Sequence, residues 1–297
     1  MKFLKESLYC AEYMLLRCLF TIVGFVPLHF LYGLAWCVGT VAYYILPHKR
    51  AIALENLSLA FGNEKTSRER RRIARAAMRN LVFVYLEFLF FARRKKGLDK
   101  YFYFDEDSGK RTMGLTKMPR AAMYLTGHIG NWELLALVAG FIGQKMHAIG
   151  RPLKNRYVFD YISRLRCSTA GAVIDKEHAV RGTIEAFKKK EIVGTLIDQR
   201  VGASGIVVDF FGQPAYTTPF PALMKIKYDC ILYPAFAIRE KIGFYRVIIK
   251  DEINIRPGEL GNLERIKYMV QEYTKVMEEM VRAYPEQWLW YHRRWRI

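Results

Sequence analysis

The segment "LTGHIGNWELLALVAG", residues 125–140, places an imidazole and a carboxylate at the start of an apolar run. His128 and Glu133 stand just before Leu134, where a pattern typical of a buried helix begins. Polar side chains at the start of a buried helix need hydrogen-bond or charge partners, because burying them unpaired costs free energy. A carboxylate that holds an imidazole fixes its tautomer and stabilises the imidazolium, so the other ring nitrogen can remove a proton from a hydroxyl or an amine. The segment therefore predicts general-base chemistry.

The spacing of His128 and Glu133 sets a condition on the local structure. Residues five apart on an ideal helix point about 140° apart, so the two side chains can meet only if a turn precedes the helix. Gly127, Gly130 and Asn131 could form that turn. An alternative needs no catalysis, because a satisfied turn histidine and a first-turn acid favoured by the helix dipole have the same spacing. The sequence contains no G-x-S-x-G segment, so a covalent acyl-enzyme is not indicated.

The elements that must position these residues alternate between short β-rich and helical runs from residue 119 onward. Strands are expected at 121–126, 146–150, 171–174, 191–198, 205–211 and 231–239, with a last strand or hairpin pair at 243–255. Helices are expected at 131–142, 155–168, 176–190, 219–228 and 259–283. The alternation predicts an α/β fold with a mostly parallel central sheet flanked by helices.

Ligands of such sheets collect beyond the carboxyl ends of the strands. His128 follows the first expected strand, and Asp198, Gln199 and Arg200 follow the fourth. Two strand ends are therefore expected to bring an imidazole and one or two carboxylates to the same rim.

The N-terminal part of the chain is expected to be a membrane anchor, residues 1–50. Residues 13–46 are overwhelmingly apolar, and the basic tripeptide "HKR" follows. From Leu28 to Leu46 about 19 residues carry no formal charge, roughly enough to cross the hydrocarbon layer. The anchor would span the bilayer or lie in one leaflet, with its basic flank on the cytoplasmic side. A hairpin of core helices, broken at Pro27, is the alternative.

Residues 51–118 are expected to form a basic amphipathic helical layer between the anchor and the α/β domain, 119–297. Thr66 or Ser67, followed by Glu69, marks a helix start. The apolar residues that follow share one helical face: Ile73, Ala77, Leu81, Val84 and Phe88. The interleaved arginines are typical of a solvated face, but beside an anchor each contributes about 1 kcal/mol of attraction to an anionic leaflet.

The composition points to anionic partners. The chain has 297 residues and a formal net charge of +19. Nucleic acid is not the expected partner, because no zinc-finger, helix-turn-helix or RNP-like pattern accompanies the charge. Five cysteines without C-x-x-C spacing argue for reduced thiols and against a disulfide or zinc framework. The acidic stretch 101–110 does not match a calcium loop and is expected to be a surface turn, so no metal is predicted.

The segment "GHIGNWE" resembles the His-x4-Asp/Glu signature of the glycerolipid acyltransferase superfamily. Its form is that of the bacterial lipid A biosynthesis (lauroyl/myristoyl) acyltransferases and their relatives, which include a mycobacterial phosphatidylinositol mannoside acyltransferase. Further blocks resemble that family in its order, so that the resemblance covers about residues 20–296: "AIALENLSLAF", "GRPLKN", "DQR", "DFFGQPAYTTPFPALMKIKYDCILYPAF" and "PEQWLWYHRRWR".

The resemblance implies an enzyme on the cytoplasmic face of a bacterial inner membrane. Such an enzyme moves a fatty acyl chain from a thioester of acyl carrier protein, or of coenzyme A, to a hydroxyl of a glycolipid such as a lipid A precursor. The thioester is a co-substrate, and no other cofactor is implied. A phosphatidylinositol mannoside-like glycolipid or an aminolipid is the alternative acceptor.

The resemblance also implies roles for individual residues. His128 is expected to be the general base and Glu133 the acid that orients it, with Asp198 as a possible second partner of the imidazole. The substrate-binding set is Arg151, which would meet the acceptor's phosphate or developing charge, together with Gln199, Arg200, Asn131 and Trp132. Arg200 departs from the Asp that often stands at its position, which leaves the identity of the acceptor open.

The expected anionic partners would explain why the chain is so basic. Acyl carrier protein is acidic and the acceptor is anionic, so both are expected on surfaces that carry basic residues. Those basic residues are Arg93 to Lys96 and Arg293, Arg294 and Arg296. The aromatic residues of "WLWYHRRWR" fit either the headgroup layer or core packing. His147, His178 and His292 are expected to be structural or exposed.

Two alternatives use the same residues differently. The base could activate water, which would make the chain a thioesterase or a lipase. A basic peripheral scaffold would keep the fold without the chemistry. Acyl transfer further requires that the ring nitrogen of His128 opens toward a lipid-sized cavity.

Overall fold

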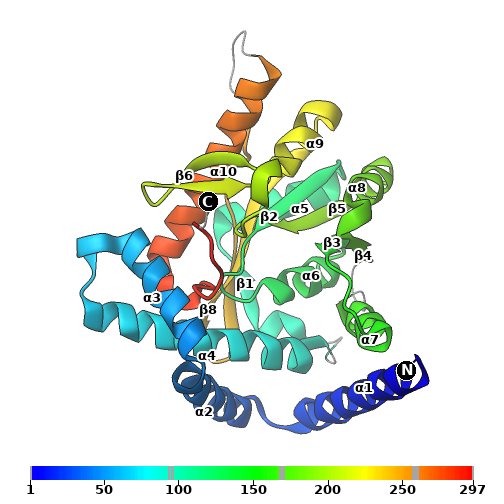
Figure 1. Ribbon diagram of the computed structural model, residues 1–297. Helices are drawn as coiled ribbons and strands as arrows, with labels where there is room; N and C mark the ends of the chain where they lie inside the picture. The colour runs from blue at the N-terminus through cyan, green and yellow to red at the C-terminus, as the bar shows by residue number, and fades with distance from the viewer. Residues whose placement is uncertain (1, 93, 95–96, 167–170, 256–260, 296–297) are drawn as a thin grey trace.

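The fold is an α/β layer structure built on a seven-stranded sheet (Figure 1). The computed structural model describes residues 2–92, 94, 97–166, 171–255 and 261–295. The strand order is β1-β9-β8-β2-β5-β3-β4, and every pairing is parallel except β8 with β9. The bounds are β1 (Phe102–Phe104), β2 (Ala122–Thr126), β3 (Met146–Gly150), β4 (Val173–Asp175), β5 (Ile192–Leu196), β8 (Ile231–Lys241) and β9 (Phe244–Ile249). The predicted fold class, a mostly parallel sheet flanked by helices, is confirmed.

Helices cover both faces of this sheet because successive side chains of its strands point to opposite faces. Ala122 and Tyr124 of β2 pack in a core with α6 (Trp132–Phe141), whereas Met123 and Leu125 pack in a second core with α10 (Asn262–Ala283). The other helices of the domain are α5 (Glu106–Lys117), α7 (Arg156–Arg166), α8 (Ala179–Lys188) and α9 (Phe220–Tyr228). The bounds of the predicted helices agree with the observed bounds within a few residues. Positions 167–168 and 259–260 of the predicted helices lie outside the described residues.

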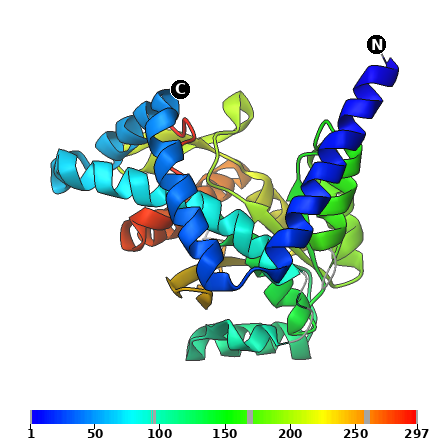
Figure 2. The ribbon, with the colours of Figure 1, turned by 90° about the horizontal axis from the view of Figure 1, so that it is seen from below.

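Two apolar helices at the N-terminus are long enough to anchor the protein in a membrane. They are α1 (Lys2–Phe25) and α2 (Leu28–Ile45), and the chain breaks between them at Pro27. Figure 2 shows that α1 runs beside α7 and that α2 packs across α4 (Ser67–Ala92). Large apolar side chains remain exposed on both helices, among them Leu15 on α1 and Leu34 on α2.

One face of α2 is nevertheless part of the protein core. Leu31, Ala35 and Tyr43 are buried against the body of the protein. A Cβ at Gly39 would lie 2.6 Å from the Cα of Arg79, so glycine permits the close approach of α2 to α4. The helix therefore has one face that packs against the protein and one apolar face that is exposed.

The helix α4 (Ser67–Ala92) begins where the sequence predicts it, after α3 (Pro47–Phe61). The backbone N–H of Thr66 donates to Glu69 Oε2 at 2.7 Å, and the N–H of Glu69 donates to Thr66 Oγ1 at 3.3 Å, which is a reciprocal cap. The predicted apolar face of α4 lies inward as expected. One continuous core contains side chains of α3 and α4 together with those of the sheet.

One prediction about local structure is wrong. Residues 101–110 are not a surface turn: β1 adds to the edge of the sheet beside β9, and Asp105 caps α5 by accepting from the N–H of Ser108 at 2.9 Å. The pairing of β1 with the distant β9 leaves no local pattern in a three-residue strand.

The strand expected at 205–211 is present as β6 (Ile206–Phe210), outside the main sheet. It forms a hairpin with β7 (Gln213–Thr217), a strand that was not predicted.

Candidate active site

The turn between β2 and α6 carries the predicted base. Gly130 has φ +61°, and a Cβ there would lie 2.0 Å from the carbonyl oxygen of Ala237, so only glycine fits. Asn131 then caps α6, because its Oδ1 accepts from the N–H of Leu134 at 3.2 Å. Glu133 lies in the first turn of α6. The turn that the spacing of His128 and Glu133 required is therefore present.

The imidazole of His128 pairs with the carboxylate of Asp198, which follows β5. Nδ1 of His128 lies 2.9 Å from Oδ1 of Asp198. The other oxygen of Asp198 accepts from the backbone N–H of His128 at 2.7 Å. An ionised carboxylate can only accept hydrogen bonds, so Nδ1 carries the proton and Nε2 is left as the basic nitrogen.

The carboxylate of Asp198 stays ionised although its side chain is only 2% exposed. Burial alone would raise the pKa of Asp198, but the charge of His128 and hydrogen bonds from His128 and Trp288 hold that pKa below its usual value. The indole N–H of Trp288 donates to Oδ2 at 2.9 Å. Trp288 is a functional contact that sequence reasoning missed, because it lies 90 positions away from Asp198.

The imidazole of His128 is partly exposed to solvent. The His128 side chain is 19% exposed. Its Nε2 lies 3.4 Å from the amide nitrogen of Gln199, and the Trp132 ring meets the imidazole edge-on at a centroid distance of 4.9 Å. Gln199 and Trp132 therefore lie beside the reactive nitrogen, where a substrate hydroxyl would approach.

Glu133 does not orient His128 as expected. Its carboxylate instead forms a bidentate pair with Arg166 of α7, in which Nε donates at 2.7 Å and Nη2 at 2.5 Å. The position that a second carboxylate would need, next to Nδ1 of His128, is occupied by Asp198. The direction of α6 explains the difference, because its first turn presents Glu133 toward α7. Arg166 was not predicted, and no pattern near it in the sequence singles it out.

The other predicted binding residues lie in different surroundings. Asn131 is fully buried, and its side chain serves the protein itself. Arg151 follows β3 and is exposed, and Arg200 is exposed with its guanidinium 5.9 Å from the Tyr216 ring centroid. Arg151 therefore stays a prediction as a substrate contact, as do Gln199, Arg200 and Trp132.

A family model described as bacterial lipid A biosynthesis acyltransferase matches residues 1–297. The chain belongs to this family. It is similar to the lipid A biosynthesis palmitoleoyltransferase of Escherichia coli (strain K12) and to the lipid A biosynthesis acyltransferase of Shigella flexneri. Each is 27% identical over 272 residues, which covers 87% of this chain and 82% of the relative. The resemblance predicted from the sequence blocks is confirmed, and the chain is an acyltransferase.

The C-terminal segment of this acyltransferase, residues 288–295, closes over the catalytic turn. Trp288 forms a β-bridge with Ile129, and the N–H of Leu289 donates to the carbonyl oxygen of His128 at 2.9 Å. The aromatic residues of the segment are buried, so the core-packing interpretation holds: Trp288, Trp290, Tyr291 and Trp295.

The basic residues predicted to attract substrates differ in their surroundings. Arg294 is not on the surface: it is 2% exposed and donates to the carbonyl oxygen of Tyr216 at 2.5 Å. Arg293 is exposed, and Arg94, just beyond the end of α4, donates back to the carbonyl oxygen of Phe90 at 3.0 Å. The remaining members, Arg93, Lys95, Lys96 and Arg296, lie outside the described residues.

His292 is closer to the site than its isolation in the sequence indicated. Burial lowers the pKa of His292, and the charges of Asp198 and His128 act on it in opposite directions. Its Nδ1 is buried and has no hydrogen-bond partner among the described residues. The prediction that His292 is merely structural or exposed therefore leaves out its proximity to the catalytic pair.

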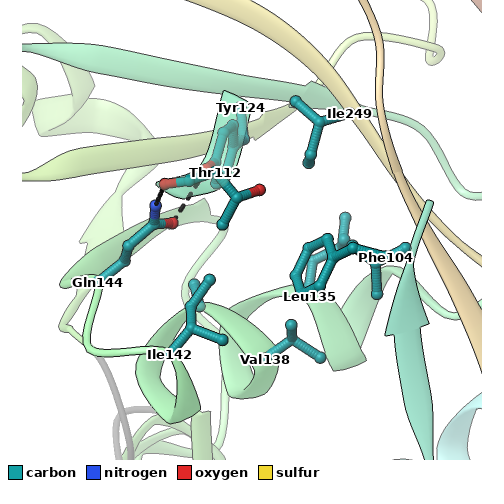
Figure 3. Close-up of a pocket in the computed structure, with 10 residues that line it drawn as sticks. Phe104, Thr112, Tyr124, Leu135, Val138, Ile142, Gln144 and Ile249 are labelled. Carbon is teal, nitrogen blue, oxygen red and sulfur yellow. Dashed lines mark hydrogen bonds between the residues drawn. The ribbon is translucent and has the colours of Figure 1, made fainter. Parts of the chain in front are cut away.

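A small apolar cavity lies between α6 and the sheet (Figure 3), and neither His128 nor Asp198 lines it. Phe104, Leu135, Val138 and Ile249 line it, and Gln144 closes one side. Its volume is about 10 Å³, about enough for one water molecule. This cavity therefore cannot hold an acyl chain. In the described ranges, no cluster of three or more His, Cys, Asp or Glu is arranged to bind a metal ion.

Proposed function

We propose that this acyltransferase moves a fatty acyl chain from a thioester to a hydroxyl of a lipid A-type glycolipid, with His128 as general base and Asp198 as its partner. The family membership supports the reaction, and the names of the two relatives support the acceptor. The observation that carries the assignment is the 2.9 Å contact between Nδ1 of His128 and Asp198, which leaves Nε2 basic and partly exposed.

The chemistry proceeds by direct attack, without a covalent enzyme intermediate. Nε2 of His128 takes the proton of the acceptor hydroxyl as its oxygen attacks the thioester carbonyl carbon. Asp198 stabilises the resulting imidazolium through Nδ1–H. The C–S bond then breaks, the ester remains on the acceptor, and the imidazolium returns its proton to the leaving sulfur. A base of this kind contributes on the order of 10²- to 10⁴-fold in rate.

Glu133 has a different role from the one its sequence position indicated. It holds the guanidinium of Arg166, whose side chain is 29% exposed at the edge of the site. A bidentate carboxylate fixes the plane of a guanidinium, so Glu133 would set the orientation of Arg166. Arg151 and Arg200 add two exposed cations after neighbouring strands β3 and β5.

The membrane provides the second part of the proposal. The apolar faces of α1 and α2 would dock the enzyme on the cytoplasmic face of the inner membrane, where lipid acceptors are present. The net charge of +19 favours both an anionic leaflet and an acidic donor such as acyl carrier protein over neutral partners. Coenzyme A thioesters, which are also anionic, are the alternative donor.

The experiment is an acyl-transfer assay of the full chain in vesicles, with acyl carrier protein thioester and a lipid A precursor. His128→Ala should lower kcat by about 100-fold or more, because the general base is lost. The matched control is His178→Ala, which removes an exposed histidine of η3 (Lys176–His178) and should retain wild-type activity. Activity of His128→Ala within about threefold of wild type would contradict the assignment. Release of free fatty acid at the same rate without acceptor would instead identify a hydrolase.

A further inference from the structure

A buried ion pair lies beneath the catalytic turn. Arg239 of β8 donates from Nε to Oε1 of Glu87 at 2.8 Å and from Nη2 to Oε2 at 2.6 Å. The side chain of Glu87, on α4, is 1% exposed and that of Arg239 is 10% exposed. Burial lowers the pKa of Arg239, but the charge of Glu87 outweighs it and holds that pKa well above its usual value. Both partners of this ion pair are therefore largely removed from water.

Hydrogen bonds connect this pair to the turn that bears His128. Asn131 Nδ2 donates to Oε2 of Glu87 at 2.9 Å. Arg239 Nη1 donates to Oδ1 of Asn80, whose Nδ2 donates in turn to the carbonyl oxygen of Gly130 at 3.3 Å. Glu87 is thus linked to Asn131 by one hydrogen bond, and Arg239 is linked to Gly130 by two, through Asn80.

The pair also reaches the helix that carries the apolar face. The hydroxyl of Tyr32 on α2 donates to Oε1 of Glu87 and accepts from the N–H of Gly243 at 2.9 Å. Glu87 therefore accepts hydrogen bonds from side chains of three parts of the fold: Tyr32 of α2, Arg239 of β8 and Asn131 of the turn. The carboxylate is the junction between the membrane-facing helix and the catalytic turn.

Stability alone does not account for this arrangement. Removing two charges from water costs several kcal/mol per ion, and apolar residues of similar volume often stabilise a protein equally well or better. A buried, fully satisfied polar network is instead suited to fixing one geometry, because every alternative leaves a charge unpaired. The atoms that this network fixes are those of the turn after His128.

We propose that Glu87 and Arg239 are positioning residues for His128, which act on the 127–131 turn through Asn131 and Asn80. This inference rests on the proposed function, since it takes His128 as the base. A displacement of a reacting group by about 1 Å can cost on the order of 10²-fold in rate. The pair would therefore act on kcat, not on substrate binding.

The test compares two carboxylate-to-amide variants. Glu87→Gln keeps the shape of the side chain but removes the charge opposite Arg239, and it should lower kcat by about 10- to 100-fold with little change in KM. The matched control is Glu252→Gln. Glu252 accepts from the buried Lys225 at 2.6 Å, away from the catalytic turn. This control should lose thermal stability but retain wild-type kcat.

A pH profile separates positioning from general destabilisation. A displaced turn weakens the contact between His128 and Asp198, and an imidazolium that loses its carboxylate partner gives up its proton more readily. The acid limb of kcat should therefore move to lower pH in Glu87→Gln and stay in place in Glu252→Gln. An unchanged limb together with a wild-type kcat in Glu87→Gln would overturn the inference.

Two further variants keep the result decisive. Glu87→Asp retains the charge opposite Arg239, which favours folding. Its side chain is too short to reach both Arg239 and Asn131. Wild-type kcat in this variant would therefore show that the charge alone matters and that the contact with the turn does not. In a His128→Ala background, Glu87→Gln should add no further loss of kcat. A full activity of His128→Ala would refute the proposed function, whereas an inactive His128→Ala with a fully active Glu87→Asp would refute only the positioning role.

Discussion

Asp198 holds His128 at two points, by the ring and by the main chain. One carboxylate oxygen lies 2.9 Å from Nδ1, and the other accepts the backbone N–H of the same residue at 2.7 Å. The first contact sets the tautomer, and the second sets the place of the residue on the turn. A single side chain after β5 therefore determines both the protonation and the position of the base.

Asp198→Asn should be nearly inactive. An amide offers one acceptor oxygen for the two donors of His128, and its NH₂ group would favour the wrong tautomer of the imidazole. We expect kcat to fall by about 10³- to 10⁴-fold, measured in the vesicle assay. Asp251→Asn, at an exposed carboxylate, is the control and should be unaffected. A loss of less than about tenfold would mean that Asp198 is not the partner of the base.

Glu133 and Arg166 should behave as one unit. Each of Glu133→Gln and Arg166→Gln breaks the same bidentate pair, so the double variant should be no less active than the more damaged single variant. Steady-state kinetics of the three variants give the coupling. If Glu133 instead acted on His128, Glu133→Gln would lower kcat further in the Arg166→Gln background.

The exposed face of α2 should govern membrane binding. Leu34 on α2 is 51% exposed, and Leu263 on α10 is 58% exposed. Leu34→Glu places a charge where the bilayer is proposed to lie, at a cost of up to about 3 kcal/mol, and should reduce co-sedimentation with vesicles. Leu263→Glu makes the same change on another helix and should bind like the wild type. Equal binding of both variants would place the membrane elsewhere.

The stability of the fold should decrease on mild acidification through His292. The pKa of His292 in the folded chain lies below the ordinary value of 6.5, so the unfolded chain takes up this proton first as the pH falls. The free energy of unfolding should then decrease from pH 6.5 downward, until the folded form is protonated as well. Denaturant unfolding of the wild type and His292→Gln between about pH 7.5 and 5 tests this. An equally steep decline in both proteins would contradict it.

The sequence predicts the fold well where periodicity is strong. The alternation after residue 119 locates β2, α6 and β5, and the rule for parallel sheets places His128 and Asp198 at one rim. The edge strand β1 escapes prediction, because only pairing with the distant β9 makes this short segment extended. The hairpin strand β7 was also missed, although it pairs with β6, which directly precedes it in the chain. The membrane role of α1 and α2 and the division at residues 50 and 118 stay predictions.

The site was only half predictable for a related reason. Both acids, Glu133 and Asp198, were candidates for holding His128, and spacing along the chain could not decide between them. The direction of α6 decides it, and Arg166 on the next helix satisfies the carboxylate that is left over. Trp288 completes the site from near the far end of the chain. Contacts of this kind depend on tertiary packing, which no local pattern encodes.

The contact of residues 288–295 with the 127–131 turn can form only late in the synthesis of the chain. The ribosome makes α1 and α2 first, and the indole that supports Asp198 comes only after nearly all of the remaining chain. Under the proposed function, a nascent chain would carry its membrane-binding helices long before the contact between Trp288 and Asp198 can form. We therefore expect a chain that ends before residue 288 to be inactive.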